Sequence, residues 1–172
     1  IVSFISAVIL LFATSVHVAF GSEIQTSFNF ARYGENILAA VSLKIPAEYH
    51  AYANKPGETG MPTTLDFNLA TVGKMPVIYP AGITRADAYD PDTRANIYEG
   101  DIMLLAVLPV SAVNMGYDAK LELLLCSDKR CQPVKESLSG RLPTDVPLLS
   151  TVAWQDAALS LLKSGTNLST LQ

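Results

Sequence analysis

The sequence holds few of the residues that catalytic and nucleic-acid-binding sites need. It has two cysteines and two histidines among 172 residues, and its 12 basic and 16 acidic side chains give a net charge of −4. No block of like charge stands out, which excludes the electrostatic footprint of a nucleic-acid-binding protein. No Ser-His-Asp set, carboxylate pair or glycine-rich phosphate loop can be placed on the chain. Hydrolase and nucleotide-binding functions therefore have no residues to carry them.

Charged residues are also missing from the first 21 positions, IVSFISAVILLFATSVHVAFG. An apolar run that ends in small residues, here Ala19 and Gly21, is typical of a secretory signal peptide. The alternative is a membrane anchor, because the run approaches the length that spans a bilayer. Both interpretations predict an exported protein in a compartment that permits disulfides. We expect a signal peptide over residues 1–21, one domain over 22–145, and a linker with a helix over 146–172.

The rest of the chain has the pattern of short β-strands. In NILAAVSLKI, Ile37, Val41 and Leu43 share one face, which predicts a half-buried strand. Similar segments, separated by turn residues, lie at 24–31, 63–70, 75–80, 96–100, 101–110 and 118–126. About eight short strands predict an all-β, immunoglobulin-like β-sandwich, with a barrel as the alternative. One short helix is predicted near the C-terminus, in TVAWQDAALSLLKSG, ending at Gly165 and packing on the outside of the domain.

The only two cysteines, Cys126 and Cys131, flank a predicted β-hairpin. Four residues separate them, a normal hairpin connection, which sets the cysteines opposite each other and within reach of a disulfide. In the first strand Cys126 alternates with Leu123 and Leu125, and Cys131 likewise points away from the apolar face of the second strand. This pattern predicts that neither sulfur lies in the core and that both are reachable.

The residues alone leave the role of this pair open. A structural disulfide suits an exported domain, but closing so short a loop adds only about 2 kcal/mol on the chain-entropy model. Thiol–disulfide exchange is favoured by Lys129, Arg130 and Lys135, whose positive charge would stabilise a thiolate, while Asp128 opposes them. The spacing C-x4-C does not choose between these interpretations.

Three motifs follow one another along the chain: EYHAYANKPGETGMPTTLDF (48–67), NIYEG (96–100) and LLLCSDKRCQP (123–133). Their order and spacing resemble the N-terminal periplasmic domain of the thiol:disulfide interchange protein DsbD and its ScsB-like relatives. The resemblance covers residues 24–142. The matching positions are Tyr49, His50, Tyr52, Pro56, Gly57, Gly60, Pro62, Thr64, Leu65, Tyr98, Gly100, Cys126, Cys131 and Pro133.

The resemblance implies an immunoglobulin-like sandwich, in agreement with the strand pattern, and a cofactor-free thiol:disulfide oxidoreductase domain. Such domains receive electrons from a membrane-embedded partner and pass them to periplasmic thioredoxin-fold proteins, including disulfide isomerases and cytochrome c maturation factors. By analogy Cys131 forms the mixed disulfide with a partner and Cys126 resolves it. An aromatic cap is expected to cover the cysteines, and we place it in residues 84–98, with Tyr89 and Asp87 as its candidates.

Four further residues are expected to shape the site: Tyr49, His50, Tyr52 and Pro133. His50 could favour a thiolate, and a histidine without a role is the alternative. A third function also stays open, because some relatives of the resembled family are linked to copper tolerance. In that case both cysteines, Met61 and His50 would form a Cu(I) site, since soft sulfur ligands suit this ion.

Overall fold

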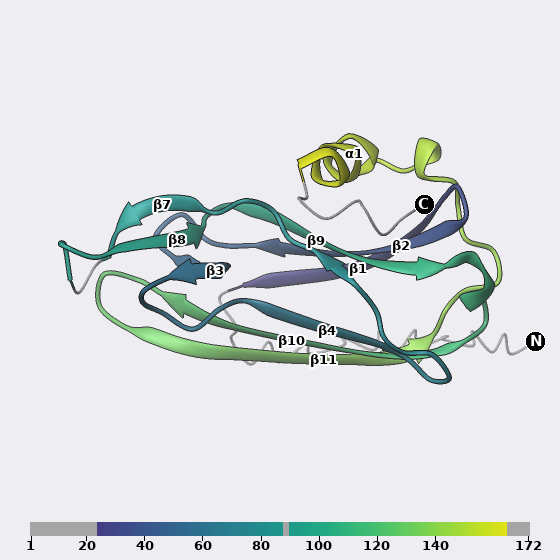
Figure 1. Ribbon diagram of the computed structural model, residues 1–172, viewed down its shortest axis with the longest axis horizontal. Helices are drawn as coiled ribbons and strands as arrows, with labels where there is room; N and C mark the ends of the chain where they lie inside the picture. The colour runs from purple at the N-terminus through teal and green to yellow at the C-terminus, as the bar shows by residue number, and fades with distance from the viewer. Residues whose placement is uncertain (1–23, 88–89, 165–172) are drawn as a thin grey trace, which may run out of the picture.

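The computed structural model describes residues 24–87 and 90–164, which form two β-sheets packed face to face with one helix on the outside (Figure 1). The predicted all-β sandwich is confirmed. The first sheet has the order β1-β2-β9-β6. Its strands are β1 (Gln25–Tyr33), β2 (Asn36–Lys44), β9 (Asp101–Pro109) and β6 (Val77–Ile78).

The second sheet has the order β5-β4-β10-β3-β8-β7, and β11 pairs with β10. Its strands are β5 (Gly73–Lys74), β4 (Thr64–Leu69), β10 (Gly116–Cys126), β3 (His50–Gly57), β8 (Arg94–Tyr98), β7 (Ile83–Ala86) and β11 (Cys131–Arg141). β10 pairs with β11 along its whole length. On its other edge it pairs first with β4 and then, at its C-terminal end, with β3. The two cysteines therefore lie where three strands meet.

The main core fills the space between the sheets. Alternate residues of the long strands enter it, as period-two patterns require. Phe67, Leu104 and Leu121 have essentially no exposed surface, and the ring of Phe67 stacks on Tyr117 at 5.3 Å between centroids. This double layer fixes the direction of every side chain in β10, including the cysteine at its end.

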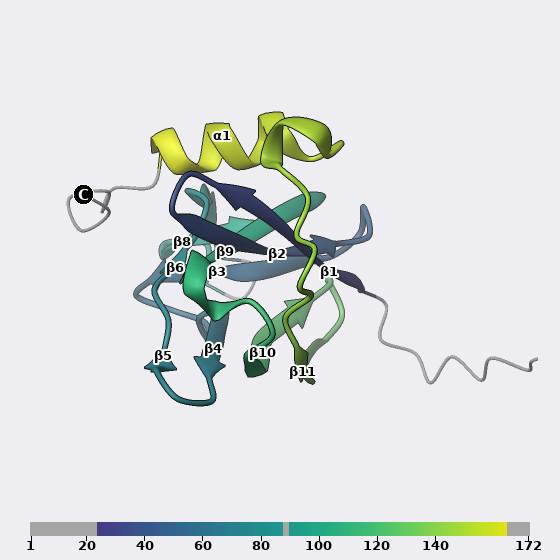
Figure 2. The ribbon, with the colours of Figure 1, turned by 90° about the vertical axis from the view of Figure 1, so that its right-hand side faces the viewer.

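The outer face of the first sheet is also buried, which corrects the prediction of a half-buried strand at 36–45. Leu38 and Ala40 of β2 are both 1% exposed, although they point away from the main core. Helix α1 (Gln155–Ser164) lies across this face and packs Leu161 and Leu162 against it (Figure 2). A strand pattern cannot reveal a cover that comes from so far along the chain.

The C-terminal helix is confirmed on the outside of the sandwich, but it begins at Gln155 instead of Thr151. Residues Leu149–Thr151, which precede the helix, form a separate 3-10 turn in which Leu149 is buried. The predicted stop at Gly165 and the predicted signal peptide over 1–21 lie outside the described residues. Within 24–87 and 90–164, no helix has the length and apolar character to cross a bilayer.

The region 84–98, expected to be a cap loop, is mostly a hairpin. β7 and β8 pair from Ile83↔Ile97 to Ala86↔Arg94. β7 escaped prediction because all four of its residues are exposed, so its sequence shows no apolar alternation.

Candidate functional site: a covered disulfide

The cysteines form a disulfide at the end of the β10–β11 hairpin. Cys126 and Cys131 are directly opposite in the register, and their Cα atoms are 4.0 Å apart. Ser127 organises the turn, because its backbone N–H donates to the Arg130 carbonyl at 2.9 Å and its Oγ accepts from the Lys129 N–H at 3.3 Å. The predicted hairpin and the predicted opposition of the cysteines are both confirmed.

The two sulfurs differ in exposure. Both cysteines lie on the face opposite the core leucines, as predicted, and Cys131 is partly buried. Cys126, however, is only 1% exposed, so the prediction that both sulfurs are reachable is wrong for this residue. It packs with Tyr52, Ala95 and Ile97 in a small separate cluster. The reason is that β3 and β8 continue the sheet beside β10, and their outward side chains close over Cys126.

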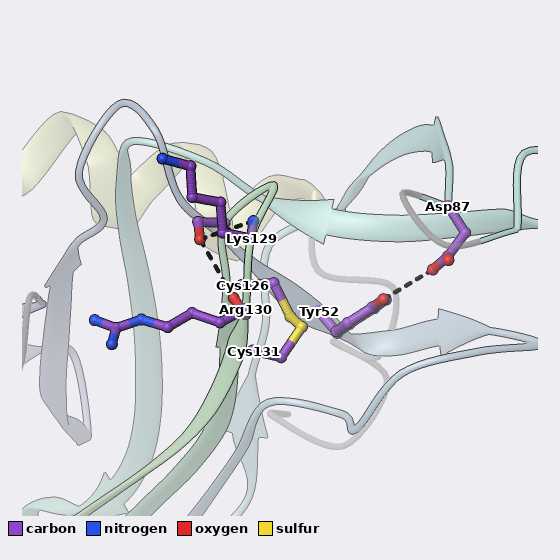
Figure 3. The surroundings of a disulfide bond; sticks show 7 residues. Tyr52, Asp87, Cys126, Lys129, Arg130 and Cys131 are labelled. Carbon is purple, nitrogen blue, oxygen red and sulfur yellow. Dashed lines mark hydrogen bonds between the residues drawn. A yellow bond between two sulfur atoms is a disulfide. The ribbon is translucent and has the colours of Figure 1, made fainter.

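Tyr52 links the disulfide to the connection between β7 and β8. Its hydroxyl donates to Oδ2 of Asp87 at 2.8 Å, and Figure 3 shows Tyr52 lying between the disulfide and Asp87. The Tyr52 and Asp87 residues are 4% and 6% exposed. Oδ1 of Asp87 accepts from the Asp90 N–H at 3.1 Å, and the Asp87 N–H donates to the Thr93 carbonyl at 2.9 Å. Asp87 thus links Asp90 and Thr93 to Tyr52, which packs on Cys126. The other cap candidate, Tyr89, lies outside the described residues.

The segment after β3 holds the ring of Tyr52 in place. Gly60 has φ +86°, and a Cβ built on it would lie 2.1 Å from Cδ1 of Tyr52, so only glycine fits here. Thr63 is fully buried, and its Oγ1 donates to the Tyr52 carbonyl at 2.6 Å. The resemblance in sequence had included Thr64 among the matching positions, but Thr64 is exposed. Alternation with Leu65 would have identified Thr63, because residues two apart on a strand share a face.

Tyr98 and Gly100 of the NIYEG motif (96–100) have structural roles. Tyr98 belongs to the main core, and its hydroxyl accepts from the Asn54 N–H at 3.3 Å and donates to the Pro80 carbonyl at 3.1 Å. Burial raises the pKa of Tyr98, so its hydroxyl stays protonated and can keep both bonds. Gly100, with φ +69°, forms the turn into β9.

The structure brings His50 to the disulfide but not Tyr49. His50 is directly opposite Cys126 in the β10–β3 pairing. Its ring makes a T-shaped contact with the ring of Tyr52, with centroids 5.8 Å apart. Tyr49 packs instead against the main core. Pro133 is exposed and opposite Leu124, on an edge strand where a residue without an N–H is tolerated.

The expected positive charge is not directed at the sulfurs. Lys129 and Arg130 are exposed, and Figure 3 shows both side chains extending away from the disulfide, on the side opposite Tyr52. Lys135 pairs with Glu122 at 3.1 Å, four positions further along β11 from Cys131. The positions of these three side chains therefore do not support the thiolate stabilisation expected of them.

The described residues give no support to a metal centre. Among residues 24–87 and 90–164, no three or more His, Cys, Asp or Glu side chains are grouped so that they could hold an ion. The disulfide occupies both sulfurs of the suggested Cu(I) set. Met61 is partly buried, but it is not among the described apolar side chains that pack against the Cys126 cluster.

Comparison with known proteins identifies the family. The family model described as the N-terminal part of the thiol:disulfide interchange protein DsbD matches residues 20–143. The chain belongs to this DsbD N-terminal family. Among solved structures, it is similar to the N-terminal periplasmic domain of ScsB from Proteus mirabilis, with a TM-score of 0.62 and 15% identity. This match covers 83% of the chain and 54% of the ScsB chain, so the protein spans about half of that relative's length.

A second solved structure is more distant. It is the complex of the DsbD and PilB N-terminal domains from Neisseria meningitidis, with a TM-score of 0.47 and 16% identity, covering 71% of this chain and 87% of that one. No curated protein sequence matches the chain. Membership of the DsbD N-terminal family, together with the disulfide itself, supports a role in thiol–disulfide interchange.

Proposed function

We propose that this DsbD-type domain relays two electrons through Cys126 and Cys131, from a membrane-embedded donor to thioredoxin-fold proteins in the periplasm. The observation that carries the proposal is the position of the disulfide. It lies on the outer face of the sheet, at the end of a hairpin, and not between the two sheets. Ten of the eleven cross-strand residue pairs of the hairpin do not involve the cysteines, so the short bridge is not needed to form it.

The unequal exposure of the sulfurs supports the division of roles. In the reduced domain the Cys131 thiolate attacks one sulfur of a partner disulfide, and the partner's other sulfur leaves as a thiolate that takes up a proton. Cys126 then attacks the Cys131 sulfur, reforms the intramolecular disulfide and releases the second partner thiol. A partner must reach the first sulfur but not the second, which fits a partly buried Cys131 and a fully buried Cys126.

The cover formed by Tyr52 and Asp87 protects the pair between encounters. Tyr52 packs on Cys126 and donates a hydrogen bond to Asp87, and Ala95 and Ile97 pack around the same cysteine. The periplasmic location is part of the same proposal. It is supported by the uncharged apolar run at residues 1–21 and by the ScsB relative, which is itself a periplasmic domain.

Stoichiometric exchange with a thioredoxin-fold protein tests this function. We expect the reduced domain, mixed with an equal amount of an oxidised periplasmic thioredoxin-fold protein, to become oxidised while the partner becomes reduced, one disulfide for one disulfide. Acid quenching and alkylation of free thiols, followed by mass measurement, report both proteins at each time. A domain that keeps both thiols while the partner keeps its disulfide would refute the relay.

A permanent structural disulfide is the second candidate, and the burial of Cys126 favours it. A sulfur that is 1% exposed and packed against Tyr52 resembles a core residue more than a reactive one. This alternative predicts a β-sandwich that unfolds or loosens when the bond is reduced.

A further inference from the structure

Cys126 lies between two cross-strand neighbours at the end of β10. It is opposite Cys131 on β11 and opposite His50 on β3. Directly opposite residues of antiparallel strands point to the same face, with Cβ atoms about 4.5–5.5 Å apart. One imidazole and two sulfurs therefore form a row across the outer face of the sheet, with Cys126 in the middle.

The burial of Cys126 creates a chemical requirement. To resolve a mixed disulfide, this residue must attack as a thiolate, because the thiol is a poor nucleophile. A thiol enclosed by Tyr52, Ala95 and Ile97 resists losing its proton, since burial disfavours the charged form. With 1% of its surface exposed, Cys126 has little access to a base from solvent. The proton must pass to a group inside the site.

The other ionisable groups that line the cavity beside His50 already have hydrogen-bond or ion-pair partners. A cavity of about 200 Å³ is lined by His50, Tyr52, Arg85, Asp87 and neighbouring residues of β7 and β8. The Tyr52 hydroxyl donates to Asp87, whose second oxygen accepts from a backbone N–H. Arg85 pairs with Glu99 at 3.4 Å, and a guanidinium cannot accept a proton.

On the other side of the row, the acidic side chains of the described hairpin residues lie exposed at its tip or are already paired. At the hairpin tip Asp128 is exposed, and the cationic side chains of Lys129 and Arg130 extend away from the disulfide. Further along the hairpin, Glu122 is paired with Lys135. An imidazole is the side chain whose ordinary titration lies near neutral pH, and it can accept a proton there.

We infer that His50 accepts the proton of Cys126 when this sulfur resolves the mixed disulfide. The inference rests on the proposed exchange function and assigns a proton acceptor to its second step. The Cys126 S–H bond breaks and its proton moves to an imidazole nitrogen, while the sulfur keeps the electron pair and bonds to Cys131. The bond from Cys131 to the partner breaks, and the partner sulfur leaves as a thiolate. In the reverse direction the imidazolium returns the proton to Cys126.

The aromatic disulfide dithiobis(nitrobenzoate) separates the two steps in one experiment. Attack by Cys131 on this probe releases a first equivalent of coloured thionitrobenzoate, and resolution by Cys126 releases the second. With His50→Gln, we expect the first phase to be unchanged and the second to slow at least about tenfold at neutral pH. The difference should vanish at alkaline pH, where the Cys126 thiol ionises without help.

His50→Phe is the matched control, because it keeps a ring against Tyr52 but has no nitrogen. Both variants should slow the second phase alike, with unchanged unfolding midpoints. If the wild-type domain shows no two-phase release, the exchange function itself fails. If wild type is biphasic and either variant keeps its second phase at neutral pH, the inference about His50 is wrong. It is also wrong if the slowing persists equally at alkaline pH, because a packing defect would not depend on pH.

Discussion

Replacing Cys126 by alanine is expected to trap the domain on its partners. In this variant Cys131 can still attack a partner disulfide, but no second thiol lies opposite it to break the mixed bond. The covalent complex should therefore accumulate as a stable species that dissociates on addition of dithiothreitol. Non-reducing electrophoresis followed by mass spectrometry of the linked peptides measures it directly.

The reverse variant, Cys131→Ala, is the matched control. It leaves only Cys126, whose 1% exposure prevents a folded partner from reaching the sulfur, so complex formation should fall to background. Small disulfides should also react more slowly with this variant than with Cys126→Ala. If Cys131→Ala accumulates the complex and Cys126→Ala does not, the two roles are reversed and the argument from exposure is wrong.

Gly60→Ala is expected to destabilise the domain and to uncover the disulfide at the same time. The backbone there has φ +86°, which costs a non-glycine residue about 1–3 kcal/mol. The added methyl group would also overlap the ring of Tyr52, and forcing the ring aside costs about 1–3 kcal/mol more. A displaced Tyr52 cannot keep its bond to Asp87, so dithiothreitol should reduce the disulfide several times faster than in wild type.

Gly73→Ala separates the two effects. Gly73 has nearly the same backbone angle, φ +92°, but a Cβ there would meet no atom within 4 Å. It should lose only the free energy that comes from the backbone and keep the wild-type rate of reduction. Urea unfolding gives the stability, and the appearance of free thiols gives the rate. Equal losses of stability in the two variants, with equal reduction rates, would show that Gly60 does not hold the cover.

Predictions from the sequence were most accurate for contacts between residues that are close together in the chain. The hairpin at 116–141 and the opposition of its cysteines depend on a four-residue turn and on alternation, and both were predicted correctly. The burial of Cys126 was not, because its cover comes from Tyr52 and Ile97 on strands distant in sequence. Alternation shows which way a side chain points, but it does not show what another segment places over it.

The same limit explains the other differences. The strand at 36–45 was expected to be buried on one face only, because helix α1, which covers Leu38 and Ala40 on the other face, follows more than 100 residues later. The hydrogen bond between Tyr52 and Asp87 joins residues 35 positions apart. The resemblance named His50, Tyr52 and Gly60, and the expected cap named Asp87; all four lie around the disulfide or around Tyr52.

The reduction potential of the Cys126–Cys131 pair tests the central claim most directly. The purified domain would be equilibrated with graded mixtures of reduced and oxidised glutathione or dithiothreitol, and its free thiols counted by alkylation. A relay predicts a potential above about −300 mV, in the range of periplasmic exchange proteins, with the same β-sheet spectrum in both redox states. A potential below about −300 mV, or loss of the fold on reduction, would mean that the disulfide is a permanent part of the structure.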